Sequence, residues 1–187
     1  YMLSTGNRYS DGEVLSHLEF FNIKQGETME REVKIRPLVQ RKKEFYGFIS
    51  SDSQIEADGK TIKLNDLAKD KPLVLCFIDP IREPTKHTLK EFGAMRETYE
   101  KWGGNILMAV PAEKLTEPFS AEKWNLPKQT IVATDSNGLM EKILSDTKQQ
   151  FNDNLPLIFI VEANGKITFR SDGYRIGTAE LIYKSLQ

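Results

Sequence analysis

A continuous apolar segment that leads into a helix start is the feature that most constrains the fold of this chain. Residues 73–78 read Leu-Val-Leu-Cys-Phe-Ile, which is typical of a strand covered on both faces. Apolar residues spaced by three and four follow over 84–102 and predict a helix that ends at Gly103-Gly104. A second buried strand is predicted over 105–110. Two buried strands separated by a helix predict an α/β fold.

The rest of the chain after residue 52 continues to alternate strands and helices. The remaining predicted elements are a hairpin over 55–62, a helical turn at 65–67, a helix over 112–124 divided at Pro118, a strand over 130–134, a helix through 139–144, a hairpin of strands 157–161 and 167–170 around Asn164-Gly165, and a closing helix over 177–186. The order βαβαβαββα predicts a mixed central sheet flanked by helices.

The residues before 53 have the texture of strands instead. Strands are predicted within 14–23, over 32–38 and around 45–49. These are too few for a deep core of their own, so we expect them to pack on a neighbour and to be part of a β-sandwich module in a longer protein. The sequence therefore predicts a β-rich segment at 1–52 and an α/β domain at 53–187.

Composition excludes several function classes. The 187 residues carry a net charge of −1 with both signs interspersed, which argues against nucleic-acid binding. The sequence contains no run of about 18 apolar residues, so we predict no membrane-spanning helix. Cys76 is the single cysteine, so neither an internal disulfide nor a cysteine-based zinc site is possible. His17 and His87 show no metal-ligand spacing, and no glycine-rich phosphate loop occurs, so we expect no metal and no cofactor.

Three segments follow one another in a characteristic order: Gly59–Leu67, Lys71–Phe77 and Asn154–Ile167. In this order they resemble the thioredoxin superfamily, especially the thiol-disulfide oxidoreductases of the ResA/TlpA type and their peroxiredoxin-like relatives. Residues 133–138 with the helix after them are similar to the insertion of such proteins. The resemblance covers 53–187 and implies a thioredoxin-like mixed sheet flanked by helices.

The resemblance fails at the dithiol. Where the family has Cys-x-x-Cys, this chain has Arg82-Glu83-Pro84-Thr85. Disulfide exchange needs one thiolate to attack and a second to resolve the mixed disulfide. Cys76 lies inside the apolar strand, where we expect it to be buried and inert, so peroxidase chemistry fails as well. The resemblance thus implies a redox-inactive domain with no catalytic residue.

The family also has a cis-proline that faces the dithiol. Pro156 matches it, so the resemblance implies a cis Leu155–Pro156 bond, beside which the family pairs an extended peptide. The first backbone N–H groups of the predicted helix, near Arg82, have no partner within the helix and can donate hydrogen bonds to a ligand. We therefore predict that this region binds a peptide, a protein or a small anion. Its candidate residues, called here the former dithiol site, are Asp79, Arg82, Glu83, Thr85, Lys86 and Pro156.

Other interpretations remain open. Arg82 and Glu83 can simply solvate a vestigial loop. A different class of function is an enzyme with non-cysteine chemistry at Asp79, Arg82 and His87, and a third is a thiol-disulfide oxidoreductase relative with residual activity.

The first residues carry a fainter resemblance. Segments 3–8 and 11–15 are similar to the region ahead of the thioredoxin-like tail in some large bacterial extracytoplasmic proteins that also carry a transglutaminase-like domain. The chain begins at Tyr1 without an initiator methionine, so we expect a mature form or an excised fragment. The resemblance implies a module of a larger bacterial protein in the periplasm or cell envelope, with the other domains of that protein as partners.

Overall fold

The computed structural model of this protein describes residues 2–7, 15–20, 45–115 and 117–187. Contacts divide the chain into two compact units, 1–42 and 43–187. In the first unit, strands β1 (Met2–Asn7) and β2 (Leu15–Phe20) form an antiparallel pair. The strand predicted within 14–23 is thus present as β2, whereas the one predicted over 32–38 lies outside the described residues.

The second unit begins earlier in the chain than the boundary at 52/53 that the sequence suggested. The backbone N–H of Tyr46 donates to the carbonyl of Ile167, and that of Ile49 donates to Gly165. The strand predicted around 45–49 is reduced to an isolated bridge between Phe48 and Lys166. Residues 45–49 therefore line the edge of the sheet without forming a full strand.

Seven strands form the sheet of the second unit, in the order β4-β3-β7-β6-β5-β8-β9. They are β3 (Gln54–Ala57), β4 (Lys60–Lys63), β5 (Leu73–Phe77), β6 (Ile106–Pro111), β7 (Thr130–Asp135), β8 (Leu157–Val161) and β9 (Ile167–Asp172). Strands β5, β6 and β7 are parallel, and the other neighbouring pairs are antiparallel. Because parallel strands end at the same edge, the loops after β5 and β6 share one end of the sheet.

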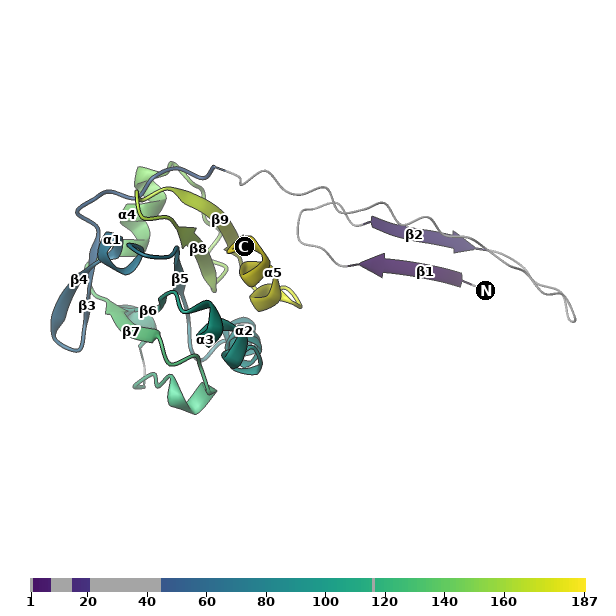
Figure 1. The fold of residues 1–187 in the computed structure, drawn as a ribbon, viewed down its shortest axis with the longest axis horizontal. Helices are drawn as coiled ribbons and strands as arrows, with labels where there is room; N and C mark the ends of the chain where they lie inside the picture. The colour runs from purple at the N-terminus through teal and green to yellow at the C-terminus, as the bar shows by residue number, and fades with distance from the viewer. Residues whose placement is uncertain (1, 8–14, 21–44, 116) are drawn as a thin grey trace, which may run out of the picture. The chain divides into compact units, whose positions relative to one another are not determined.

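Helices cover both faces of this sheet (Figure 1). Helices α1 (Leu64–Leu67) and α4 (Leu139–Asp146) pack on one face, and helices α2 (Glu83–Ala94), α3 (Arg96–Trp102) and α5 (Thr178–Ser185) pack on the other. The prediction of a mixed sheet flanked by helices is confirmed.

Strand β5 is an interior strand of the sheet, between β6 and β8, and both of its faces are buried. Leu73, Leu75 and Phe77 point into the core under α1 and α4, whereas Val74 and Cys76 point into the core under α2, α3 and α5. The apolar run at 73–78 therefore forms a strand that is covered on both faces, as predicted.

The helix predicted over 84–102 is in fact two helices that meet at Met95, where φ is −97° and ψ is 14°. The break follows Gly93, a weak helix former. The carbonyl oxygen of Trp124 lies so close to Gly93 that an added Cβ would stand 2.4 Å from it. Close packing of another segment thus coincides with the end of α2.

The prediction of a helix over 112–124 is wrong. Over 112–115 and 117–124, the residues described there, two short 3-10 turns form, η1 (Ala112–Lys114) and η2 (Glu122–Trp124). Pro118 lies between them, lacks an N–H and restricts the residue before it, so a continuous helix is blocked. The segment instead forms an irregular connection from β6 to β7, and it shapes the site described next.

Candidate functional site

Three chain segments surround the former dithiol site at the carboxyl end of β5. They are the loop 78–82 that leads into α2, residues 154–156 before β8, and the loop 173–177 before α5. The backbone N–H of Gly173 donates to the carbonyls of Asn154, at 2.8 Å, and Pro156, at 2.9 Å. These bonds tie the second segment to the third. The Leu155–Pro156 peptide bond is cis, the isomer that the resemblance implies, and Pro156 is buried.

Asp79 organises the loop before α2. Its residue is only 3% exposed, and its Oδ1 accepts a hydrogen bond of 3.3 Å from the backbone N–H of Ile81. Its Oδ2 lies 3.6 Å from Nε of Arg82, whose own N–H donates to the carbonyl of Asp79. A buried carboxylate with these partners closes a tight turn.

The two positions of the lost dithiol have opposite exposures. Arg82, the N-cap of α2, has a side chain that is 53% exposed, whereas Thr85 is fully buried. The Thr85 hydroxyl oxygen accepts a hydrogen bond of 3.3 Å from the backbone N–H of Asp79. Both replacement side chains are therefore bonded to Asp79, one through its backbone and one through its carboxylate.

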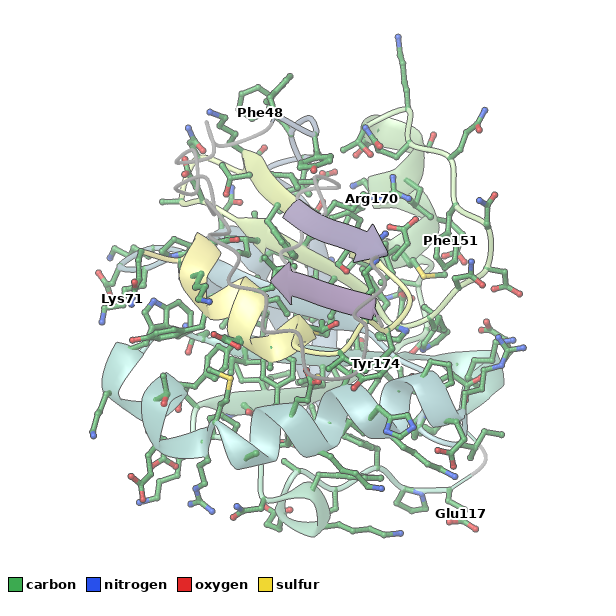
Figure 2. The ribbon with its side chains drawn as sticks, turned by 90° about the vertical axis from the view of Figure 1, so that its right-hand side faces the viewer. Phe48, Lys71, Glu117, Phe151, Arg170 and Tyr174 are labelled. Atoms are coloured by element: carbon green, nitrogen blue, oxygen red, sulfur yellow. The ribbon has the colours of Figure 1, made fainter. Side chains whose placement is uncertain are left out.

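Glu83 lies close to two further side chains of α2, Lys86 and His87. Its carboxylate lies 3.5 Å from Nζ of Lys86 and 3.5 Å from Nε2 of His87. The His87 ring stacks on Tyr174, with ring centroids 5.1 Å apart, and Figure 2 shows Tyr174 beside α2. Across the described part of the chain, no hydrogen bond, ion pair or ring contact joins His87 to Asp79 or Arg82. The structure thus brings Asp79 and Arg82 together but places His87 in a different cluster.

A carboxylate that sequence reasoning missed links α2 to α5. Glu91 Oε1 accepts hydrogen bonds from the Tyr174 hydroxyl, at 2.9 Å, and from the N–H of Gly177, at 2.8 Å, while Oε2 accepts the N–H of Ala179 at 3.0 Å. Partial burial and the hydrogen bond to Glu91 raise the pKa of Tyr174. No local pattern marks Glu91, because its donors lie more than eighty residues along the chain.

Cys76 lies outside this site. It is fully buried on the face of the sheet that α2 covers, and it is paired with Met108 on one side and Ile158 on the other. Burial raises the pKa of its thiol far above the ordinary range. A thiol in this state is a poor nucleophile.

A cavity of about 240 Å³ opens beside the former dithiol site. It is lined by Pro80, Ile81, Lys86, Lys114, Glu117, Pro118, Phe119, Ser120, Lys123 and Trp124. Only Lys86 among these was a candidate from the sequence. Pro80 and Ile81 lie in the loop before α2, and the other missed residues lie in the β6–β7 connection, which was predicted as a helix.

The described residues offer neither a metal site nor a membrane-spanning helix. Within residues 45–115 and 117–187 and the two described strands before them, no group of His, Cys, Asp and Glu side chains converges in a way that would hold a metal ion. The helices in these same ranges are too short or too polar to cross a bilayer.

No protein-family model and no curated protein sequence matches this chain. Solved structures do match the fold of the second unit. The Chlorobium tepidum protein described as the thiol:disulfide interchange protein DsbE has 18% identity and a TM-score of 0.55, over 75% of this chain and 98% of its own. StoA from Bacillus subtilis has 16% identity and a TM-score of 0.52, over 72% and 95%.

The exposed lipoprotein thioredoxin Etrx1 from Streptococcus pneumoniae is similar as well, with 20% identity and a TM-score of 0.50, over 71% of this chain and 96% of its own. All three structures are at most 20% identical to this chain, so the likeness concerns the fold. The second unit of this chain therefore has a thioredoxin-like fold.

Proposed function

We propose that this chain is a redox-inactive thioredoxin-like domain that binds a peptide or protein at the former dithiol site. The observation that carries this proposal is the hydrogen-bonded loop from Asp79 to Thr85. Residues that bond to Asp79 occupy both positions of the dithiol, and the rest of the framework around them is retained. A retained framework without sulfur favours binding over exchange.

The chemistry of thiols supports the first half of the proposal. Exchange and peroxide reduction both start from an accessible thiolate. Cys76 is fully buried with a raised pKa, and it projects from the face of the sheet into the core under α2. Residual activity through Cys76 would require the core to open.

The surface around the site supports the second half. The Arg82 guanidinium faces Asp79 through Nε, so its terminal NH2 groups are the donors that a ligand carboxylate would meet. Ile81 and Ile176 are 56% and 68% exposed on two of the three segments that surround the site. A cation beside exposed apolar side chains suits an amphipathic peptide.

The setting we propose is a larger bacterial extracytoplasmic protein, in which other domains of the parent chain are further partners. Its support is the fold shared with an exposed lipoprotein thioredoxin and the faint resemblance of segments 3–8 and 11–15.

Insulin-reduction and peroxide-consumption assays with the purified chain test redox inactivity. We expect no turnover above background in the presence of dithiothreitol or thioredoxin reductase. Turnover that disappears in Cys76→Ser would overturn the redox-inactive assignment.

Binding is tested separately with a fluorescein-labelled peptide that carries glutamates around one phenylalanine. Arg82→Glu should weaken its binding by about tenfold, because a like charge replaces a guanidinium. Lys90→Glu, an exposed position on α2 away from the site, is the matched control. Equal affinity for the wild type and Arg82→Glu would count against binding at this site.

A further inference from the structure

The cavity beside the former dithiol site has a wall that is fixed to α2. The β6–β7 connection contacts the helix at Gly93, where the absence of a Cβ admits the carbonyl of Trp124. Arg96 Nη1 donates to the side-chain oxygen of Asn125 at 2.6 Å, and Asn125 Nδ2 in turn lies 3.5 Å from the carbonyl of Gly93. The Asn125–Gly93 bond and the close backbone approach therefore hold η2 against α2, and the Arg96–Asn125 bond ties the end of η2 to the start of α3.

One part of the cavity lining is apolar, and lysines, a glutamate and a serine make up the rest. Ile81 stands exposed at one side, and the aromatic rings of Phe119 and Trp124 are half-buried against the core on the other. Pro80 and Pro118 add rigid apolar surface. Such a lining favours a large apolar group that leaves water.

The charges around the cavity have mostly one sign. Lys86, Lys114 and Lys123 line it, against Glu117 as the one carboxylate among the described lining residues. Lys86 is 3.5 Å from Glu83, whereas Lys114 and Lys123 belong to the connection on the opposite wall. Glu117 is labelled at the lower edge of the molecule in Figure 2. A ligand with carboxylates around an apolar centre would complement this arrangement.

The size of the cavity selects among such ligands. At about 240 Å³ it is smaller than the usual range for drug-sized ligands and cofactors, roughly 300–1,000 Å³. It has room for one large side chain, with the rest of the ligand outside on the lysine-bearing rim. We infer that this cavity is an anchor pocket for an acidic protein segment, which inserts one aromatic or large aliphatic side chain and meets the lysines with its flanking carboxylates.

This inference rests on the proposed function, since it names the place and the chemistry of the partner that the domain binds. The anchor pocket is a different surface from the former dithiol site, because the anchoring side chain enters it between α2 and the β6–β7 connection. Among the described lining residues, only Lys86 also belongs to the former dithiol site.

Fluorescence anisotropy on the full chain, with the labelled glutamate–phenylalanine peptide as probe, tests the inference. The double variant Lys114→Glu/Lys123→Glu should weaken binding by about tenfold or more, and the affinity of the wild type should fall as salt is raised. Lys69→Glu/Lys90→Glu makes the same change of charge at exposed positions outside the cavity and should bind like the wild type. Replacing the phenylalanine of the probe by alanine should cost at least about tenfold.

Each alternative outcome contradicts a defined part of the proposal. Unchanged affinity in Lys114→Glu/Lys123→Glu would overturn the anchor pocket, and a loss confined to Arg82→Glu would leave binding at the former dithiol site intact. Phenylpropionate alone binding as tightly as the peptide would show a small-molecule pocket instead. If the wild type does not bind the probe, the anchor pocket is wrong, whereas redox inactivity is decided independently by the insulin assay.

Discussion

The hydroxyl oxygen of Thr85 accepts a hydrogen bond of 3.3 Å from the backbone N–H of Asp79. Thr85 occupies the buried position of the lost dithiol, and Asp79 is the first residue after the apolar run of the central strand. The bond therefore closes the loop over the end of β5. A position that would hold a resolving sulfur in a redox protein serves here to fix the loop.

Restoring the two sulfurs tests whether the framework is otherwise kept. Arg82→Cys/Thr85→Cys places cysteines at an exposed N-cap and a buried position one helical turn later. Since a cysteine at a helix N-terminus has a lowered pKa, we expect the double variant to form a disulfide and to reduce insulin well above the wild-type background. Each single variant is a control, because one sulfur cannot resolve a mixed disulfide. Thiol alkylation followed by mass spectrometry would reveal a failure to form the disulfide, which would argue that the framework has diverged.

The natural thiol should be silent in the folded protein. Cys76 is fully buried and its thiol pKa is raised by burial, so 5,5′-dithiobis(2-nitrobenzoic acid) should label it only after denaturation with urea. Cys76→Ser should destabilise the fold by about 1–3 kcal/mol, because a hydroxyl replaces the thiol among apolar neighbours. Cys76→Ala should cost less than Cys76→Ser in the same urea unfolding curves. Rapid labelling of the native chain would be inconsistent with a sealed core.

Asp79 and Arg82 should contribute unequally to stability. Asp79→Ala removes the acceptor for the N–H of Ile81 and leaves Arg82 without its partner, so we expect a loss of about 1–2 kcal/mol. Arg82→Ala removes only a half-exposed cation at 3.6 Å and should cost less than about 1 kcal/mol. Urea denaturation of both variants measures the difference. Equal costs would show that the ion pair, rather than the turn, carries the energy.

The central part of the fold was predictable because its signals are local. The run at 73–78 is apolar on both faces, and only a strand at the centre of a covered sheet uses such a run. The hairpin between β8 and β9 was marked by Asn164-Gly165, where Gly165 has a φ of +80° and the Asn164 side chain accepts the N–H of Lys166. In both cases neighbouring residues alone determine the conformation.

The prediction for the β6–β7 connection was wrong because the conformation of this segment depends on distant contacts. Its apolar residues are spaced as in a helix, yet Phe119 and Trp124 pack on the core from an irregular chain. The cavity depends on that path, since Lys86 comes from α2 and Lys114 from the connection. Of the candidate site residues, Asp79 and Arg82 are three positions apart and form their ion pair within one turn, whereas the stacking of His87 on Tyr174 depends on tertiary contacts.

One pH dependence follows from an ion pair far from the site. Lys142 Nζ donates to Asp52 Oδ1 at 2.7 Å, and the Ser50 hydroxyl donates to the same oxygen. These bonds lower the pKa of Asp52 to about 2. A lowered pKa stabilises the fold above the unfolded value of about 3.9, and this contribution is lost as the pH falls towards about 2. Carboxyl 13C NMR titration should show the pKa of Asp52 moving up towards its ordinary value in Lys142→Met. A pKa that stays near that of the wild type would indicate another cause.

Gly93 tests how tightly the β6–β7 connection is fixed to α2. Alanine normally stabilises a helix relative to glycine by roughly 1 kcal/mol. At Gly93, however, an added Cβ would stand 2.4 Å from the carbonyl oxygen of Trp124, a backbone atom that cannot turn aside. We expect the steric clash to outweigh the gain in helix propensity, so Gly93→Ala should destabilise the domain by about 1–3 kcal/mol in urea unfolding. Lys90→Ala, at an exposed position of the same helix, should change stability by no more than about 0.5 kcal/mol. If Gly93→Ala instead stabilises the domain, the connection can shift away from α2, and the wall of the cavity is not fixed by this contact.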